Sequence, residues 1–155
     1  MAEPAFTETL QIGIVVRDLE ATVRRYSDDF GIGPWQRFEF TPENAPDLHE
    51  HGEPAKSSWR LATATVGQVQ WELIEPLDDQ GIYARFLTEK GGGVHHIAVA
   101  SRAYDELVSG QKRKGKELAL HGTFSGVEVA YLDTERDLGV LVEIFSGQLD
   151  AAEDR

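Results

Sequence analysis

Two glutamates lie inside apolar, strand-like segments, where a charged side chain needs a physical reason. Glu72 stands in residues 71–74 (WELI) and Glu143 in residues 142–145 (VEIF). Alternate side chains of a strand share one face, so each glutamate projects from an otherwise apolar run. A carboxylate in such surroundings is costly unless it is paired or bound to a cation. The two glutamates therefore indicate either a metal site or the half-exposed face of a sheet.

The elements that must position these glutamates follow the same order, β-α-β-β-β, in both halves of the chain. In the first half we expect strands at 10–16, 35–40, 59–66 and 69–74, with a helix at 18–30 that Asp18 caps and a polar loop at 41–57. In the second half we expect strands at 94–100, 118–121, 127–132 and 140–145, with a helix at 104–116. A short helix at 82–89 and the glycine run 91–93 separate the halves.

Overlaying the halves as an internal repeat places Gln11 over His96 and Glu72 over Glu143. Each repeat then begins with a strand that bears a metal-capable residue and ends with a strand that bears a glutamate. A two-fold relation between the repeats would carry the four side chains to a common point. One imidazole, two carboxylates and one amide oxygen suit a divalent ion such as Zn, Co, Ni, Mn or Mg. Taken singly, a strand histidine or glutamate is more often a packed or solvent-facing residue.

The composition excludes several other kinds of chemistry. The 155 residues include no cysteine, which rules out disulfides, thiolate metal sites and cysteine nucleophiles. The formal net charge of −12 repels phosphate backbones and anionic lipids. No apolar run approaches the roughly 20 residues of a membrane span. We therefore expect no nucleic acid, no membrane and, by default, a cytoplasmic location, while a small-molecule partner stays open.

Several segments resemble the vicinal oxygen chelate superfamily, which includes glyoxalase I, methylmalonyl-CoA epimerase, extradiol dioxygenases and bleomycin-resistance proteins. The resemblance covers about residues 8–147. It is most specific in 72–77 (ELIEPL), 84–87 (ARFL) and 92–98 (GGVHHIA), which look like methylmalonyl-CoA epimerase, and 139–143 (GVLVE) resembles the closing strand of the same family. It implies an α+β fold in which two tandem βαβββ modules form a curved, cup-like mixed sheet with helices outside. We expect one domain over 8–147, with modules at about 8–78 and 92–147, followed by a polar tail at 148–155.

Carried over position by position, the metal ligands of the family fall on Gln11, Glu72, His96 and Glu143, while His95 points to the other face. Methylmalonyl-CoA epimerases usually carry histidine where Gln11 stands, but a Gln, Glu, His, Glu set resembles that of animal-type glyoxalase I. The resemblance further implies that Glu143 is the base that moves a proton beside a carbonyl, through a metal-stabilised enolate. A glutamate that the epimerases carry on the third strand is missing from residues 58–65.

Two classes of function follow from the resemblance. The first is a metal-dependent isomerase, epimerase or glyoxalase-like lyase acting on an acyl thioester or oxo compound. The alternative is a protein that binds a small molecule or sequesters an antibiotic on the same fold without catalysis. An extradiol dioxygenase fits less well, because that branch resembles a two-histidine, one-carboxylate iron site and Gln11 replaces the first histidine.

Further residues are candidates for the substrate pocket or for a second site. Apolar walls with a few polar groups are typical of small-molecule pockets, and core packing explains the same residues equally well. The candidates are Trp35, Trp59, Thr63, Gln70, Phe86 and Tyr131. The triplet His49-Glu50-His51 is a second metal site, a lid or, as we favour, a solvated loop. Family members commonly dimerise, and exposed sheet edges give a physical reason to expect a homodimer.

Overall fold

The computed structural model describes residues 3–147, and within this range the chain divides into two compact units. The N-terminal unit comprises Gln11–Pro46 and Ala55–His95, and the C-terminal unit comprises residues 3–10, 47–54 and 96–147. The boundaries fall inside β1 (Glu8–Val15) and β7 (Gly93–Ala100). The polar tail predicted at 148–155 lies outside the described residues.

The N-terminal unit is a mixed sheet with strand order β2-β5-β6-β1. Its strand β1 runs parallel to β6, whereas β5 is antiparallel to both β2 and β6. The elements are α1 (Leu19–Phe30), β2 (Gln36–Phe40), β5 (Trp59–Val66), β6 (Val69–Pro76) and α2 (Gly81–Lys90). The parallel pairing of the first and last strands follows from the crossover through α1, since antiparallel neighbours are joined by short turns.

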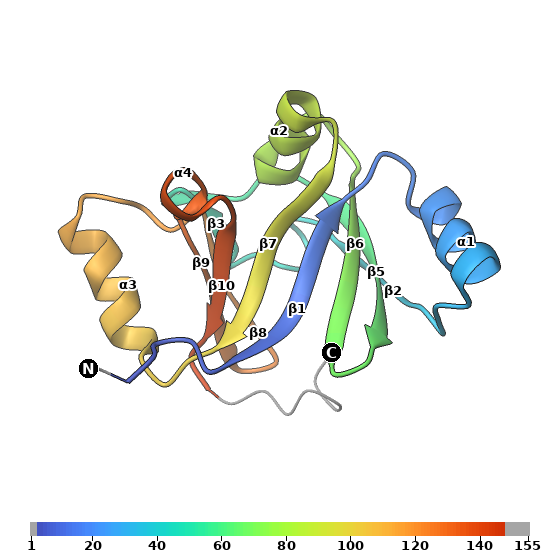
Figure 1. Cartoon of the computed structure of the whole chain (residues 1–155). Coiled ribbons are helices and arrows are strands. Elements are labelled where there is room, and N and C mark those ends of the chain that lie inside the picture. The colour runs from blue at the N-terminus through green and yellow to red at the C-terminus, as the bar shows by residue number, and fades with distance from the viewer. Residues whose placement is uncertain (1–2, 148–155) are drawn as a thin grey trace. The chain divides into compact units, whose positions relative to one another are not determined.

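Helix α1 covers one face of this sheet (Figure 1). Its start is capped by the Asp18 side chain, which accepts a hydrogen bond from the Ala21 N–H at 3.0 Å. It ends at Gly31, whose positive φ of 68° suits a residue without a Cβ. The apolar stripe of α1, with Leu19 and Val23, packs onto the sheet residues Ala62 and Leu73. The face that bears Leu73 is therefore the helix-covered face of the unit.

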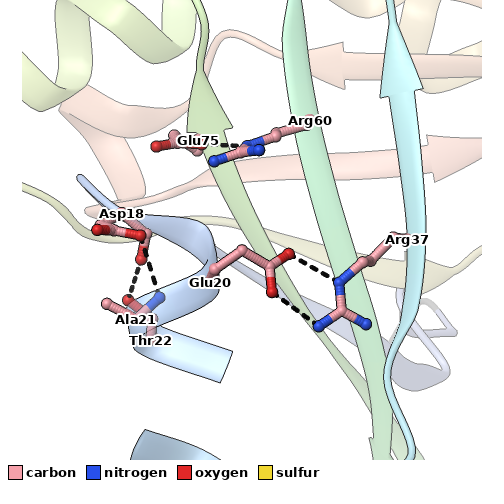
Figure 2. A network of polar contacts seen from close by, with 7 residues as sticks. All are labelled: Asp18, Glu20, Ala21, Thr22, Arg37, Arg60 and Glu75. Carbon is pink, nitrogen blue, oxygen red and sulfur yellow. Dashed lines mark hydrogen bonds and ion pairs between the residues drawn. The ribbon is translucent and has the colours of Figure 1, made fainter. Parts of the chain in front are cut away.

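Figure 2 shows a polar network at the edge of this helix-covered face. The Glu20 carboxylate of α1 accepts two hydrogen bonds from the Arg37 guanidinium of β2, at 2.8 and 2.9 Å. The hydrogen bond from Arg37 lowers the pKa of Glu20 below its usual value. Beside it, Arg60 of β5 donates to Glu75, its register partner on β6. The pair of Glu20 and Arg37 joins α1 to the sheet at the surface. The network therefore belongs to the helix-covered face and not to the opposite face.

The C-terminal unit contains the remaining strands in the order β7-β10-β9-β8-β3-β4. As in the N-terminal unit, its first long strand, β7, runs parallel to its last, β10. The elements are β3 (His49–Glu50), β4 (Glu53–Pro54), α3 (Tyr104–Arg113), β8 (Leu120–Phe124), β9 (Val127–Leu132), α4 (Glu135–Leu138) and β10 (Leu141–Phe145). The predicted internal repeat is confirmed in topology, because each half returns to a strand parallel to its first.

Helix α3 covers one face of the C-terminal unit (Figure 1). Tyr104 at its start packs with Val99, Val142 and Ile144 in one apolar cluster. Burial is the main reason that the pKa of Tyr104 is raised to about 12. The cluster identifies the helix-covered face of β7, β9 and β10. Among residues 3–147, no helix is long and apolar enough to cross a membrane.

The structure differs from the sequence prediction in four segments, one of which is the short helix α4 at Glu135–Leu138. Helix α3 ends at Arg113 rather than 116, because Gly115 adopts a positive φ of 73° that takes the chain out of the helix. Strand β8 accordingly lies at Leu120–Phe124 instead of 118–121. The predicted loop at 41–57 contains the hairpin of β3 and β4, whose turn residues His51 and Gly52 both have positive φ.

Gly92 occupies a position that no larger residue fits, so Gly92→Ala is expected to destabilise the chain. Its φ is +105°, and a Cβ there would meet the Val15 carbonyl oxygen at 2.9 Å. Backbone strain and overpacking each cost about 1–3 kcal/mol, which predicts a total loss of about 3 kcal/mol in the free energy of unfolding. Urea unfolding followed by circular dichroism measures this loss.

The neighbouring Gly91 is the matched control, because its φ is +80° but a Cβ would meet nothing within 4 Å. Gly91→Ala should therefore cost only the left-handed strain of about 1 kcal/mol. Equal losses for the two variants would show that the contact with Val15 does not matter.

Candidate functional site

The predicted site residues lie on the sheet faces that the helices leave uncovered. In the N-terminal unit Leu73 faces α1, so the adjacent Glu72 faces the opposite side of β6. In the C-terminal unit Val142 and Ile144 face α3, so Glu143 between them faces away from the helix. The alternation that suggested the site in the sequence thus holds in both units.

In the N-terminal unit the structure brings Gln11 of β1 and Glu72 of β6 together. The Gln11 side chain is only 5% exposed. Its Nε2 donates to Gln70 Oε1 at 2.6 Å and approaches Glu72 Oε2 at 3.5 Å. Thr63 of β5 is the register partner of Glu72 and lies on the same face. This unit therefore offers an amide and a carboxylate on neighbouring strands.

In the C-terminal unit the structure brings His96 of β7 and Glu143 of β10 together. His96 is fully buried and Glu143 is 7% exposed. His96 Nε2 lies 3.4 Å from Glu143 Oε2 and 3.4 Å from the Tyr131 hydroxyl of β9. The rings of His96 and Tyr131 are 4.6 Å apart between centroids. The imidazole nitrogen that faces Glu143 is thus held by contacts on two sides.

His95 and His96 are neighbours on β7 but have different surroundings. The His95 ring lies 5.0 Å from the rings of Tyr83 and Phe86 on α2. His96, the next residue, instead contacts Tyr131 and Glu143. Neighbouring side chains of a strand point to opposite faces, as predicted for this pair. His95 is a buried aromatic packing residue.

The donor chemistry in each unit fits a divalent metal ion. Within residues 3–147 no group of three or more His, Asp or Glu side chains stands at metal-binding distance. Each unit holds a pair instead: an amide with a carboxylate, and an imidazole with a carboxylate. The first pair can offer oxygen donors, and the second an imidazole nitrogen with a carboxylate oxygen, which borderline divalent ions accept in proteins.

The six predicted pocket residues have different surroundings. Thr63 and Gln70 lie beside Glu72 or Gln11, and Tyr131 lies beside His96. Trp35 instead packs under α1, with its ring 5.8 Å from that of Tyr26. Trp59 stacks on Phe40 at 5.6 Å and meets Tyr83 edge to face at 5.1 Å, and Phe86 contacts His95. The last three residues thus make aromatic packing contacts, the alternative that the sequence left open, and their place in a pocket stays a prediction.

Two local features were not found from the sequence. A surface hollow of about 430 Å³ in the C-terminal unit is lined by residues 101–106, Ser146 and Gly147, and includes none of the predicted pocket residues. His49 lies opposite His121 in the β3–β8 pair, and its Nδ1 is 2.9 Å from the Asp47 carbonyl oxygen. The pairing of His49 and His121 could not be anticipated, because β3 was predicted as loop.

The fold and the paired donors define a class of protein with a repeated βαβββ module. A family model matches residues 10–131, and the chain belongs to the Glyoxalase/Bleomycin resistance protein/Dioxygenase superfamily. This finding confirms the predicted superfamily. The mixed α+β fold of the vicinal oxygen chelate proteins is likewise confirmed by the solved structures that the chain matches.

The chain also matches individual solved structures. Methylmalonyl-CoA epimerase from Mycobacterium tuberculosis matches with a TM-score of 0.67 and 21% identity, over 94% of this chain and 91% of that one. A variant of Streptomyces coelicolor methylmalonyl-CoA epimerase, in complex with 2-nitronate-propionyl-CoA, matches with a TM-score of 0.66 and 24% identity, over 90% and 96%.

A curated relative matches over a shorter stretch. The uncharacterized protein YqjC of Bacillus subtilis is 33% identical over 89 residues, which are 54% of this chain and 62% of that protein. The chain thus spans about three fifths of the length of this relative. At 21% and 24% identity, the likeness to the solved structures establishes the fold but not the reaction.

Proposed function

We propose that this chain is a divalent-metal-dependent isomerase, epimerase or glyoxalase-like lyase that moves a proton on a carbon beside a carbonyl or thioester. The observation that carries the proposal is the buried His96–Glu143 pair, which places a carboxylate 3.4 Å from an imidazole nitrogen inside an apolar strand. The proposed metal ligands are Gln11, Glu72, His96 and Glu143. The buried amide of Gln11 and the half-buried carboxylate of Glu72 are the second pair of donors in this proposal.

In this proposal the chain's own residues divide the chemistry between them. Glu143 takes the proton from the carbon, and the electron pair of the broken C–H bond moves toward the carbonyl oxygen. Return of a proton to the opposite face of the same carbon completes an epimerisation, and return to a neighbouring atom completes an isomerisation. The bound ion would supply positive charge that favours the enolate. Apolar neighbours of Glu143 on β10, such as Leu141 and Phe145, limit the access of water.

The relatives support a choice of substrates to test. The Streptomyces coelicolor epimerase binds a propionyl-CoA derivative, which makes an acyl-CoA thioester the first substrate to test. A hemithioacetal is the second, because the Gln, Glu, His, Glu donor set resembles the glyoxalase arrangement. We further propose that the protein acts as a homodimer in the cytoplasm.

Metal removal tests the proposed function. We expect the purified chain to hold about one divalent ion after dialysis, because structural and catalytic metal sites of this donor type bind one ion each. Chelation should abolish deuterium exchange from solvent into methylmalonyl-CoA or a hemithioacetal, and one added equivalent of ion should restore it. Metal analysis combined with proton NMR of the substrate measures both effects.

Two results would contradict this proposal. Exchange that continues unchanged in chelated protein would exclude a metal-dependent reaction. Tight binding of a small molecule with no metal and no exchange would instead support the non-catalytic binding protein.

A further inference from the structure

The Gln11 carboxamide has a defined orientation in the N-terminal unit. Gln11 and Gln70 are register partners on the parallel strands β1 and β6. The Gln11 nitrogen donates to Gln70 Oε1 at 2.6 Å, and the same nitrogen lies 3.5 Å from Glu72 Oε2. Both oxygens are acceptors on β6, so they draw the NH₂ end of the amide to that side. The Gln11 oxygen is therefore directed away from these two acceptors.

The opposite orientation of this amide is disfavoured by its neighbours. Turning the group over would bring the Gln11 oxygen against the Glu72 carboxylate, so that two acceptors would face each other. It would also break the present bond to Gln70, which could form again only if Gln70 turned over its own amide, and the two acceptors of Gln11 and Glu72 would still face each other. Gln11 is 5% exposed, so water offers little replacement.

The second half of the chain supplies a comparison. There His96 takes the place of Gln11, and its register partner on β10 is Leu141, which takes the place of Gln70. An imidazole presents a nitrogen donor on its own ring, and His96 is held by Tyr131 and Glu143. A carboxamide has an oxygen end and a nitrogen end, and only the oxygen suits a metal. A polar register partner, Gln70, thus stands beside the carboxamide, whose two ends differ, whereas an apolar one, Leu141, stands beside the imidazole.

We propose that Gln70 is a positioning residue: it holds the Gln11 amide by its nitrogen and so presents the Gln11 oxygen to a divalent ion. This inference rests on the proposed function, because it assumes that Gln11 is a metal ligand. Residues that orient a ligand typically change metal affinity by about 10- to 100-fold when they are replaced. Gln70 would act through Gln11 and would not itself touch the metal.

The test replaces Gln70 by leucine, the residue that the other repeat carries at the equivalent position. Zn²⁺ and Mn²⁺ titrations of the full chain should give an affinity about 10- to 100-fold lower than that of the wild type. In a Gln11→Leu background, Gln70→Leu should cause no further loss, because no carboxamide remains to be oriented. The control is Thr65→Val, at the register partner of Gln70 on β5, which should leave the affinity unchanged.

A second readout needs no metal. The side-chain NH₂ resonances of Gln11 in the metal-free protein should move on Gln70→Leu toward those of a solvent-exposed glutamine, because the bond to Gln70 is lost.

Two failures can be told apart. If the wild type binds neither Zn²⁺ nor Mn²⁺, the proposed function falls and the role of Gln70 falls with it. If the wild type binds metal but Gln70→Leu has full affinity, or lowers it equally in the Gln11→Leu background, the positioning role alone is wrong. An unchanged Gln11 NH₂ signal would contradict that role as well.

Discussion

Replacement of Glu143 by glutamine is expected to slow solvent-deuterium exchange beside the substrate carbonyl by about 10²- to 10⁴-fold, the usual contribution of a positioned acid or base. Glutamine keeps the shape of the side chain and an oxygen that can face His96, but it cannot accept a proton at neutral pH. The variant should therefore still bind the divalent ion, though more weakly because an anionic ligand is lost, and should lack the reaction even with the ion in excess. Proton NMR of the substrate and metal analysis of the same sample measure the two quantities.

Two further variants separate the role of Glu143 as a base from its charge. Glu128 lies on the neighbouring strand β9 but is exposed, and Glu128→Gln should leave the exchange rate unchanged. Glu72 occupies the equivalent position in the first repeat, so Glu72→Gln removes the same charge from a proposed ligand. We expect a smaller loss of rate for Glu72→Gln than for Glu143→Gln. Equal losses would mean that Glu143 acts only through its charge and not as the base.

The faces of the strands were predictable from the sequence because a strand has a period of two. Glu72 and Glu143 are each flanked by apolar residues that pack under a helix, so the alternation alone determined their side of the sheet. The overlay of the repeats then predicted equivalent positions. The register agrees, since Gln11 pairs with the residue two before Glu72 and His96 with the residue two before Glu143.

Contacts across strands were harder to predict, because they depend on register and not on spacing along the chain. The bond between Gln11 and Gln70 joins residues 59 positions apart, and that between His96 and Tyr131 joins residues 35 apart. Both Gln70 and Tyr131 were candidates for a pocket, but their partners were unknown. Trp35 was predicted as a pocket residue on the same grounds, but it packs against the apolar cluster under α1. An aromatic side chain suits a pocket wall and a core equally well, so the residue type alone does not distinguish the two.

The short elements were missed for a different reason. The β3–β4 hairpin has two residues in each strand, and α4 spans four residues, which is too little for a periodic pattern. The hairpin is held by tertiary contacts, such as the bond from the Thr123 N–H to the Asp47 carboxylate at 3.0 Å. Such contacts form only after the chain has folded, so a local pattern does not contain them.

Replacement of His96 by leucine is expected to lower the affinity for the divalent ion by more than about 100-fold, because even the loss of a residue that only orients a ligand costs about 10- to 100-fold. His96 is fully buried, with Nε2 directed at Glu143 and Tyr131. Leucine has a similar volume but no donor atom. Isothermal titration of the metal-free chain with Zn²⁺ measures the affinity, and thermal unfolding of the same sample measures the stability.

His95 provides the matched control, since it is a buried histidine on the same strand that packs against Tyr83 and Phe86 instead. His95→Leu should lower the unfolding midpoint by an amount similar to His96→Leu, because each variant removes one buried imidazole with aromatic contacts. It should nevertheless keep the wild-type affinity for Zn²⁺. If the two variants lose metal equally, the loss comes from a loosened fold, and the assignment of His96 as a ligand is wrong.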